Sequence, residues 1–395
     1  MSPLPLPSAR SETVGLLPDR LERLTAVMTR ELEGKATGAS MLIARGGKIA
    51  FNQQIGTLRA GGPPIAGDTI FRIYSMTKPI VTVAAMTLVE EGRLSMLDPV
   101  SAFIPAFAGM KVGVERDGKL DLEPLKRAVT VQDLMRHTSG LTYGFTGSDA
   151  VHKLYAAADL RSETQTTADF VAAISALPLF RQPGVKWEYS LSTDVLGRIV
   201  EIATGQSLGA ALRARVFEPL GMTDTGFFTP ETEVARRADP IASGFAFMSK
   251  AGVGWCNATA APKFESGGGG LVSTLPDYSR FCAMLLGGGA LDGVRVLGPR
   301  TLRFMASDHL DATVDRSHAL LWPGHGFGLG FAVREATGLA PTAGSVGEFF
   351  WGGMMGTAFW ISPADDLFAI LMIQAPEHRE YFRVLFRNLV QAAIG

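Results

Sequence analysis

The chain has almost no net charge and few cysteines, and both scarcities exclude classes of protein. Its 395 residues contain 37 Lys and Arg against 38 Asp and Glu, a formal net charge of −1. A balanced charge gives no general attraction to nucleic acid or to an anionic membrane, so we expect neither as a partner. The two cysteines, Cys256 and Cys282, are too few to form a disulfide framework or a zinc site unaided. A reducing compartment suits this cysteine usage, so we expect a cytoplasmic protein.

Long hydrophobic runs are also missing. The apolar-rich segment 170–180 is interrupted by Ser175 and Pro178. It is far shorter than the ~20 residues that cross a bilayer. The segment 1–12 has prolines at positions 3, 5 and 7 and no basic start, so it does not resemble a signal peptide. We therefore expect neither a membrane segment nor a secretory leader.

Signals for a metal or a cofactor are lacking as well. The six histidines form no close-spaced pair of metal ligands. His137 is expected to be structural, because its His-Thr-Ser-Gly setting is typical of a buried turn. The tetraglycine 267–270 is not followed by the Lys-Ser/Thr of a phosphate-binding loop. We expect no cofactor and no metal.

The chain does have ample apolar material, with 47% hydrophobic and 19% charged residues. Helical periodicity predicts a helix over 19–34 and a long helix that ends at Gly92. Two short apolar runs around Gly46 and Gly47 predict a β-hairpin. The patterns are mostly helical from about 95 to 240, and strand-like runs return in the last third. The chain ends in an amphipathic helix over 379–395.

These elements predict an α/β protein of the α+β type. Its antiparallel sheet is expected to be flanked by the N- and C-terminal helices, with a mostly helical subdomain inserted between the parts of the sheet. We assign residues 1–95 together with 245–395 to the sheet subdomain. Residues 96–244 form the helical subdomain, and we expect the active site between the two.

The strongest local signal for chemistry is the segment 75–78, Ser-Met-Thr-Lys, where a strand-like run meets a helix. Residues i and i+3 share a helix face, so the Ser75 hydroxyl and the Lys78 amine are expected within hydrogen-bond reach. Pro79 lacks an N–H group, which is tolerated only near a helix start. The helix dipole there favours an oxyanion at Ser75. Lys78 can act as the base for this serine if burial depresses its pKa. The four-residue pattern also arises by chance, but the helix start and the preceding strand favour catalysis.

This motif resembles the Ser-x-x-Lys motif of the serine β-lactamase and penicillin-binding-protein superfamily. The chain is still more similar to the family VIII carboxylesterases, which are relatives of class C β-lactamases. Segments that are typical of the superfamily follow in order and extend the resemblance over most of residues 18–393: 134–141, 267–281 and 326–331. The resemblance implies a β-lactamase-like fold and an acyl-enzyme on Ser75.

Two further motifs assign roles by the same resemblance. Tyr189 stands where the superfamily carries Tyr-x-Asn, which implies a second base that shares the Ser75 proton with Lys78. The segment 351–353, Trp351-Gly352-Gly353, stands where β-lactamases carry Lys-Thr-Gly, and it is the form found in family VIII esterases. It implies a substrate-binding edge, at which glycines allow close approach. The backbone N–H groups of Ser75 and Met354 are implied as the oxyanion donors. Packing alone for Tyr189 and a simple turn for the two glycines are the structural alternatives.

A second serine motif is present but lies in the wrong context. The segment 205–209, Gly-Gln-Ser-Leu-Gly, fits the nucleophile elbow of α/β-hydrolases, which requires a strand directly before the serine. The preceding residues have helical spacing instead. We therefore expect Gly205 to end one helix and Ser207 to cap the next.

The departures from the β-lactamase pattern select the function. Leu191 and Trp351 replace an amide-holding Asn and a carboxylate-binding Lys, which weakens the binding of an anionic β-lactam and leaves a neutral ester unaffected. Arg136 and Arg316 are basic residues that could compensate. We expect a serine carboxylesterase that hydrolyses small short-chain acyl esters. The alternatives are a β-lactamase or acyltransferase that uses the same site, and a non-catalytic scaffold that binds peptides or self-associates.

Overall fold

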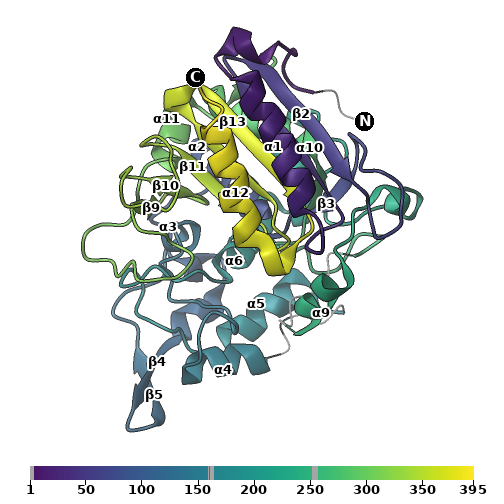
Figure 1. The fold of residues 1–395 in the computed structure, drawn as a ribbon. Helices are drawn as coiled ribbons and strands as arrows, with labels where there is room; N and C mark the ends of the chain where they lie inside the picture. The colour runs from purple at the N-terminus through teal and green to yellow at the C-terminus, as the bar shows by residue number, and fades with distance from the viewer. Residues whose placement is uncertain (1–3, 159, 161–163, 251–256) are drawn as a thin grey trace.

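The computed structural model describes residues 4–158, 160, 164–250 and 257–395. Its centre is a seven-stranded sheet in the order β2-β1-β13-β12-β11-β10-β9, with every neighbouring pair antiparallel. The sheet therefore combines strands from the beginning and from the end of the chain (Figure 1). Its strands are β1 (Gly38–Arg45), β2 (Lys48–Gly56), β9 (His325–Phe327), β10 (Ala332–Arg334), β11 (Phe349–Gly352), β12 (Ala358–Ser362) and β13 (Leu367–Ile373).

The first two strands form the expected hairpin. β1 pairs with β2 from Gly38↔Gly56 to Arg45↔Lys48. Gly46 and Gly47 make the turn with φ values of +60° and +69°, which an L-residue with a side chain rarely adopts.

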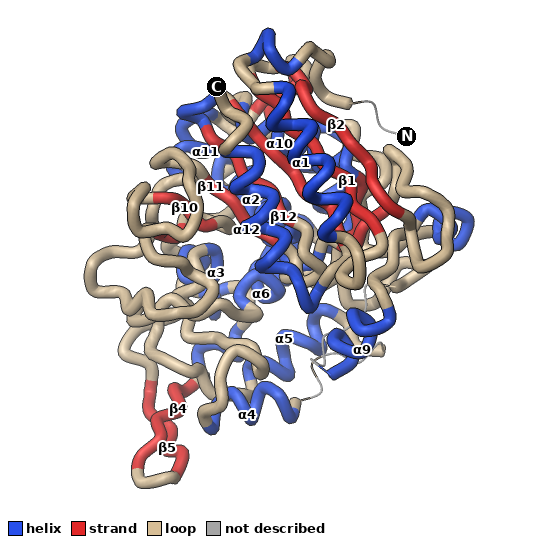
Figure 2. The backbone as a smooth tube through the Cα atoms, viewed as in Figure 1, coloured by secondary structure: helices blue, strands red, loops and turns tan. Residues whose placement is uncertain are grey.

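Both faces of the sheet are covered by helices. α1 (Pro18–Glu31) and α12 (Arg379–Gln391) contact each other and lie side by side over one face (Figures 1 and 2). α2 (Thr77–Glu90) and α10 (Leu275–Leu286) share the hydrophobic core of the other face. In β13, Phe368 and Ile370 join the α2 side while Ala369 and Leu371 join the α1 side. Alternate residues of a strand point to opposite faces, so a sheet buried on both faces needs a continuous apolar run.

The middle of the chain is mostly helical and packs on the sheet region through α2. α6 (Ser192–Thr204) contacts α2, α3 and α5. The remaining helices are α3 (Val131–Met135), α4 (Ala150–Ala157), α5 (Thr167–Ser175), α7 (Leu208–Leu212), α8 (Glu218–Leu220), α9 (Ala242–Lys250) and α11 (Pro299–Met305). Three two-stranded sheets pair β3 (Ile70–Arg72) with β6 (Val272–Thr274), β4 (Lys111–Arg116) with β5 (Lys119–Pro124), and β7 (Ala290–Leu291) with β8 (Val294–Arg295).

The predicted antiparallel sheet between terminal helices, with helices added by the middle of the chain, is confirmed. The strand-like interpretation of the last third was incomplete, because α10 and α11 also lie there. The subdomain limits, 1–95 with 245–395 and 96–244, stay predictions. Cys282 is buried, and Cys256 lies outside the described residues.

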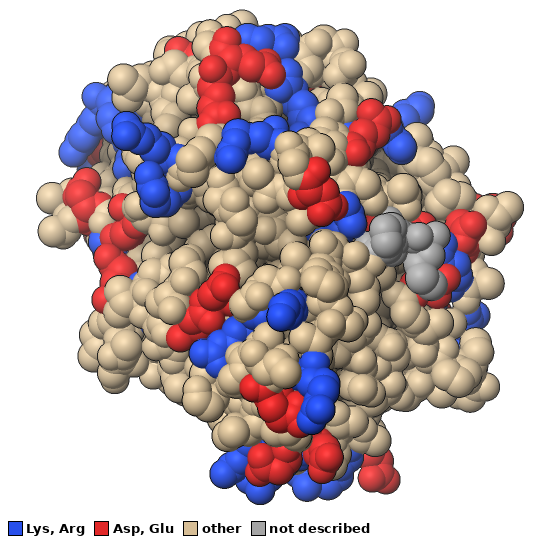
Figure 3. Space-filling model, turned by 90° about the horizontal axis from the view of Figure 1, so that it is seen from above, with Lys and Arg blue, Asp and Glu red and all other residues tan. Residues whose placement is uncertain are grey.

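Surface charge and helix length agree with the composition. Both signs of charge occur across the face in Figure 3, with uncharged side chains between them. Among the residues that the structure describes, no helix is both long enough and apolar enough to cross a bilayer.

Candidate active site

Ser75 lies in a single turn of 3-10 helix, Tyr74–Met76, directly between β3 and α2. Tyr74 has a positive φ of +42°, so the chain bends sharply just before the serine. The Ile73 N–H donates to Leu271 O at 3.1 Å, which ties this bend to the strand beside it. The bend presents the half-buried Ser75 side chain at the start of a helix, as the sequence predicted.

Lys78 lies one turn further on and is fully buried. Its Nζ donates to Ser75 Oγ at 3.3 Å, to Tyr143 OH at 3.1 Å and to Gly268 O at 2.7 Å. Three acceptors satisfy the three protons of an ammonium group. The predicted contact between Ser75 and Lys78 is therefore present.

The groups around Lys78 bear on the condition under which it could act as the base, a lowered pKa. Burial is the largest single influence and lowers the pKa, as expected. The phenol oxygens of Tyr143 and Tyr189 and the Asp194 carboxylate together outweigh burial, and the pKa of Lys78 is raised above its ordinary value. From the sequence, the role of Lys78 as a base is conditional on a lowered pKa, whereas these neighbours shift that pKa upward and favour the protonated amine.

Tyr143 was missed by the sequence analysis. It follows the segment 134–141 by two residues, on a loop that no helical or strand pattern marks. Its ring stacks on Phe145 at 4.8 Å between centroids and lies 5.5 Å from the Tyr189 ring. Burial raises the pKa of the Tyr143 phenol, so its hydroxyl stays protonated while it accepts from Lys78.

Asp194 is the second residue that the sequence did not reveal. Its Oδ1 accepts from Ser266 Oγ at 2.6 Å and from the Gly268 N–H at 2.9 Å. The Gly268 carbonyl accepts a hydrogen bond from Lys78. The Asp194 carboxylate therefore positions the loop to which the lysine is bound. A Cβ on Gly268 would lie 2.3 Å from Asp194 Oδ2, which explains a glycine of the tetraglycine segment as a close approach.

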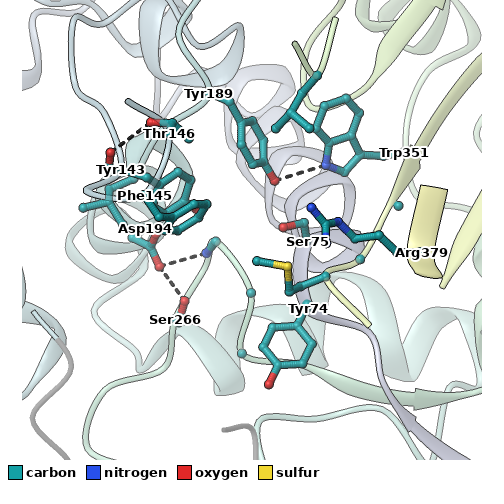
Figure 4. A pocket seen from close by; sticks show the side chains of 18 of the residues that line it. Tyr74, Ser75, Tyr143, Phe145, Thr146, Tyr189, Asp194, Ser266, Trp351 and Arg379 are labelled. Atoms are coloured by element: carbon teal, nitrogen blue, oxygen red, sulfur yellow. Dashed lines mark hydrogen bonds between the residues drawn. The ribbon is translucent and has the colours of Figure 1, made fainter. Parts of the chain in front are cut away.

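Tyr189 lies just before α6 and packs beside Lys78. The Lys78 Nζ is 4.5 Å from the centre of the Tyr189 ring. The Trp351 Nε1–H donates to Tyr189 OH at 3.3 Å, and the two ring centroids are 5.2 Å apart. Figure 4 shows the two side chains meeting beside Ser75. The structure thus joins the Tyr189 and Trp351 motifs, which lie 162 positions apart in the sequence.

The two glycines after Trp351 bring the end of β11 against the Ser75 turn. A Cβ on Gly353 would lie 2.2 Å from Ile73 O, so only glycine allows this approach. The Gly353 N–H donates to Thr357 O at 2.8 Å, and the Gly356 N–H donates to Gly353 O at 2.9 Å. No protein acceptor takes the Met354 N–H within the part of the chain that the structure describes. That donor is free for a substrate oxygen.

These groups surround a cavity of about 1620 Å³. Ser75, Tyr189, Leu191 and residues 351–354 line it, and aromatic side chains form much of the remaining wall, among them Phe145, Phe170, Phe227, Phe247, Phe264, Trp322 and Phe350. Arg379 of α12 also lines the cavity, and its side chain extends toward Ser75 (Figure 4). Apolar walls with a few convergent polar groups are typical of small-molecule sites.

The other sequence motifs lie elsewhere. Ser207 is exposed, and its Oγ caps α7 by accepting from the Ala210 N–H at 3.3 Å, as predicted. His137 is buried in a turn at φ +57°, and its Nδ1 is 3.2 Å from Ser190 Oγ. No cluster of three or more metal-ligating side chains occurs among the described residues.

Comparison with known proteins identifies the class to which this fold and site belong. The family model described as Beta-lactamase matches residues 21–394. The chain belongs to this family.

Two curated relatives extend over nearly the whole chain. Esterase EstB of Burkholderia gladioli is 32% identical over 373 residues, which is 89% of each chain. Lovastatin esterase of Penicillium rubens is 31% identical over 369 residues, covering 87% of this chain and 90% of the relative. Among solved structures, EstCE1, described as a hydrolase with promiscuous acyltransferase activity, superposes with a TM-score of 0.75. It is 24% identical and covers 94% of this chain and 98% of its own. This last similarity shows the shared fold.

Proposed function

We propose that the protein is a serine ester hydrolase that works through an acyl-enzyme on Ser75. The observation that carries the proposal is the Ser75–Lys78 contact of 3.3 Å at the base of a large apolar cavity. A serine hydroxyl needs a proton acceptor to become a nucleophile, and Tyr189, which lies beside Lys78 and lines the same cavity as Ser75, can supply one. A non-catalytic scaffold would not need this buried polar set.

The first half-reaction forms the acyl-enzyme. Ser75 Oγ attacks the ester carbonyl carbon, and its proton passes to the oxygen of Tyr189. The carbonyl oxygen becomes an oxyanion between the N–H groups of Ser75 and Met354. The tetrahedral intermediate then collapses, the bond to the alcohol oxygen breaks, and the alcohol leaves with the proton from Tyr189.

The surroundings of Lys78 raise its pKa and favour a division of roles in this proton transfer. An ammonium cannot accept a proton, but it stabilises a phenolate and a developing alkoxide beside it. We propose Tyr189 as the base, the role that the resemblance implies, with the Lys78 Nζ 4.5 Å from its ring and 3.3 Å from Ser75 Oγ to stabilise the negative charge that develops during the transfer. Water repeats the sequence in reverse to release the acid and restore the serine.

The apolar walls of the cavity favour esters with an uncharged acyl group. Trp351 and Leu191 present apolar surface where the superfamily carries a cation and an amide. EstB and lovastatin esterase are both named as esterases, which supports the same reaction class. A cytoplasmic location stays a prediction.

Acyl transfer to an alcohol is a second candidate, favoured by the size of the cavity. Typical small-molecule pockets measure about 300–1,000 Å³, and this cavity exceeds that range. The extra space can admit an alcohol acceptor in place of water. Adding a primary alcohol during ester turnover separates the two reactions, because transfer produces a new ester and hydrolysis a free acid.

The test is a comparison of two serine variants on p-nitrophenyl esters of graded acyl length. Ser75→Ala is expected to abolish hydrolysis, while Ser207→Ala keeps wild-type rates because its hydroxyl only caps α7. Loss of activity in the folded Ser207→Ala protein would sink the proposal. Unchanged activity in Ser75→Ala would do the same.

A further inference from the structure

The peptide bond between Gly353 and Met354 has an unusual neighbour. Arg383 of α12 donates from its NH2 group to Gly353 O, and the same group is 3.4 Å from Thr357 O. Its other terminal nitrogen donates to Glu380 Oε1 at 2.7 Å. A charged group from the C-terminal helix therefore clamps the turn that follows Trp351.

The geometry of a peptide plane links this clamp to the oxyanion site. The C=O of Gly353 and the N–H of Met354 belong to one planar unit, and in a trans peptide they point in opposite directions. No cis peptide bond occurs among the described residues. Anchoring the carbonyl on the α12 side therefore turns the N–H away from α12, toward the space beside Ser75.

Charge adds to orientation. The Gly356 N–H already donates to Gly353 O at 2.9 Å, so the turn alone gives the carbonyl an approximate direction. A guanidinium on the same oxygen polarises the peptide and makes its N–H a stronger donor. That donor matters most when the substrate oxygen becomes negative, which is the step an oxyanion site accelerates.

Gly352 shows how closely the guanidinium is fitted. A Cβ at position 352 would lie 2.7 Å from Arg383 Cζ. Any larger residue there would displace the guanidinium. The two glycines of the Trp-Gly-Gly segment therefore serve different contacts, Gly352 with Arg383 and Gly353 with Ile73 O.

We propose that Arg383 is a positioning residue for the oxyanion site, acting through the Gly353–Met354 peptide. The proposal rests on the ester hydrolase function inferred above. It assigns to α12 a role in transition-state stabilisation that no motif in the sequence indicates.

The test compares p-nitrophenyl butyrate with its thionoester, in which sulfur replaces the carbonyl oxygen. Sulfur is a poor hydrogen-bond acceptor, so a working oxyanion site favours the oxygen ester. Arg383→Lys and Arg383→Met should lower kcat/KM for the oxygen ester by about tenfold, less than the roughly 10²–10³ seen when a donor itself is removed. The thionoester should change much less, so the ratio of the two kcat/KM values falls.

This ratio separates a positioning role from a loss of folded protein. Partial unfolding lowers both rates together and leaves the ratio unchanged, and that outcome would overturn the proposal. Gly352→Ala provides an independent variant that keeps the arginine but moves it, and it should lower the ratio in the same way.

The matched control is Arg45→Lys, which alters another arginine that clamps backbone carbonyls. Arg45 donates to Gly15 O at 2.6 Å and to Asp365 O at 3.2 Å, away from the cavity. The ratio of the two kcat/KM values in Arg45→Lys should equal that of the wild type. A lower ratio in this variant would also count against the proposal. If the wild type does not hydrolyse the oxygen ester, the proposed function is wrong. If the wild type hydrolyses it and the Arg383 variants keep the wild-type ratio of the two kcat/KM values, only the role of Arg383 is wrong.

Discussion

Two walls of the cavity around Ser75 are built from different material. The proposed proton-transfer wall presents side chains from distant parts of the chain, Tyr143, Tyr189 and Asp194, and includes the fully buried Lys78. The proposed oxyanion wall consists of the backbone of Gly352, Gly353 and Met354, which Arg383 contacts at Gly353 O. The first wall depends on charges that compensate one another inside the protein. The second depends on the close approach that Gly352 and Gly353 allow because they have no side chain. Different substitutions should therefore disrupt each wall.

The proton-transfer wall should show the largest effects. Lys78→Ala and Tyr189→Phe should each lower kcat by about 10²–10⁴, the range of general acid–base catalysis. Because Lys78 stabilises the charge that develops when Tyr189 accepts the Ser75 proton, the two residues act as one unit, and the double variant should be little worse than either single variant. Steady-state rates on p-nitrophenyl butyrate measure this. Losses that multiply would show that the residues act independently.

Substitutions in the oxyanion wall should have the next largest effect on kcat/KM. Here the damaging change is the addition of a side chain where the structure has glycine. Gly353→Ala places a Cβ 2.2 Å from Ile73 O, so the turn must shift away from Ser75. We expect kcat/KM to fall by about 10²-fold, as for the loss of an oxyanion donor. Gly338→Ala is the matched control, since no atom lies within 4 Å of a Cβ there. Equal rates for both alanine variants would contradict the assignment.

Tyr143 distinguishes support of Lys78 from direct proton transfer. Tyr143→Phe removes an acceptor at 3.1 Å from Lys78 Nζ, and we expect about a tenfold loss of kcat. Tyr143 raises the pKa of Lys78, so its removal should lower that pKa. The alkaline decline of kcat, where Lys78 loses its proton, should therefore begin at a lower pH in Tyr143→Phe than in the wild type. A loss of rate with an unmoved profile would leave Tyr143 a packing role only.

The charge of the substrate should also change kcat/KM, through residues beside the oxyanion wall. A reactive cephalosporin should be hydrolysed with a much lower kcat/KM than a short-chain ester, because Trp351 and Leu191 offer no partner to its carboxylate. Arg379 lines the cavity, with Nε 3.7 Å from Glu380 Oε1. Arg379→Gln should lower the cephalosporin value by a further factor of about five and the ester value less. A cephalosporin value at or above that of the best ester would place the chain functionally with the β-lactamases.

The smallest effects concern buried histidines that pack behind both walls. His137 lies 5.0 Å from the Tyr189 ring, and His325 lies 5.1 Å from the Phe350 ring. Burial lowers the pKa of His137 well below its usual range and that of His325 to about 4. The unfolded chain binds protons at these histidines near pH ~6.5, whereas the folded protein does not, so the free energy of unfolding falls as pH falls.

Urea unfolding at pH 7, 6 and 5 measures that fall. Each such histidine contributes up to ~1.4 kcal/mol per pH unit between its unfolded and folded pKa values. His325→Gln should make the decline between pH 6.5 and 4 shallower. An identical slope in the variant would show that His325 does not contribute.

Local patterns predicted the features that depend on neighbouring residues. The hairpin at Gly46 and Gly47, the helix after Ser75 and the cap at Ser207 each follow from a short segment. Family resemblance placed Tyr189 and Trp351, although 162 positions separate them. The hairpin, the helix and the cap could be predicted because turn chemistry and helix spacing act over only a few residues, whereas the roles of Tyr189 and Trp351 stay predictions from the resemblance.

The missed residues act through tertiary contacts that have no local signature. Tyr143, on a loop, and Asp194, in the first turn of α6, come near Lys78 only once the chain is folded. From the sequence, Arg136 and Arg316 are basic residues that could replace the carboxylate-binding lysine. Arg136 instead pairs with Asp133 at 3.1 Å, and Arg316 pairs with Asp308 at 2.7 Å. The net charge of a buried lysine likewise depends on every partner around it, which periodicity does not reveal.

The central claim is that both walls serve one acyl-enzyme on Ser75. Rapid quenching of the protein during turnover of p-nitrophenyl butyrate, followed by mass spectrometry of the intact chain and its peptides, tests it directly. We expect one butyryl group, located on the peptide that contains Ser75 and absent from Ser75→Ala. A butyryl group on Ser207 or on any other residue, or full turnover by Ser75→Ala, would contradict the account.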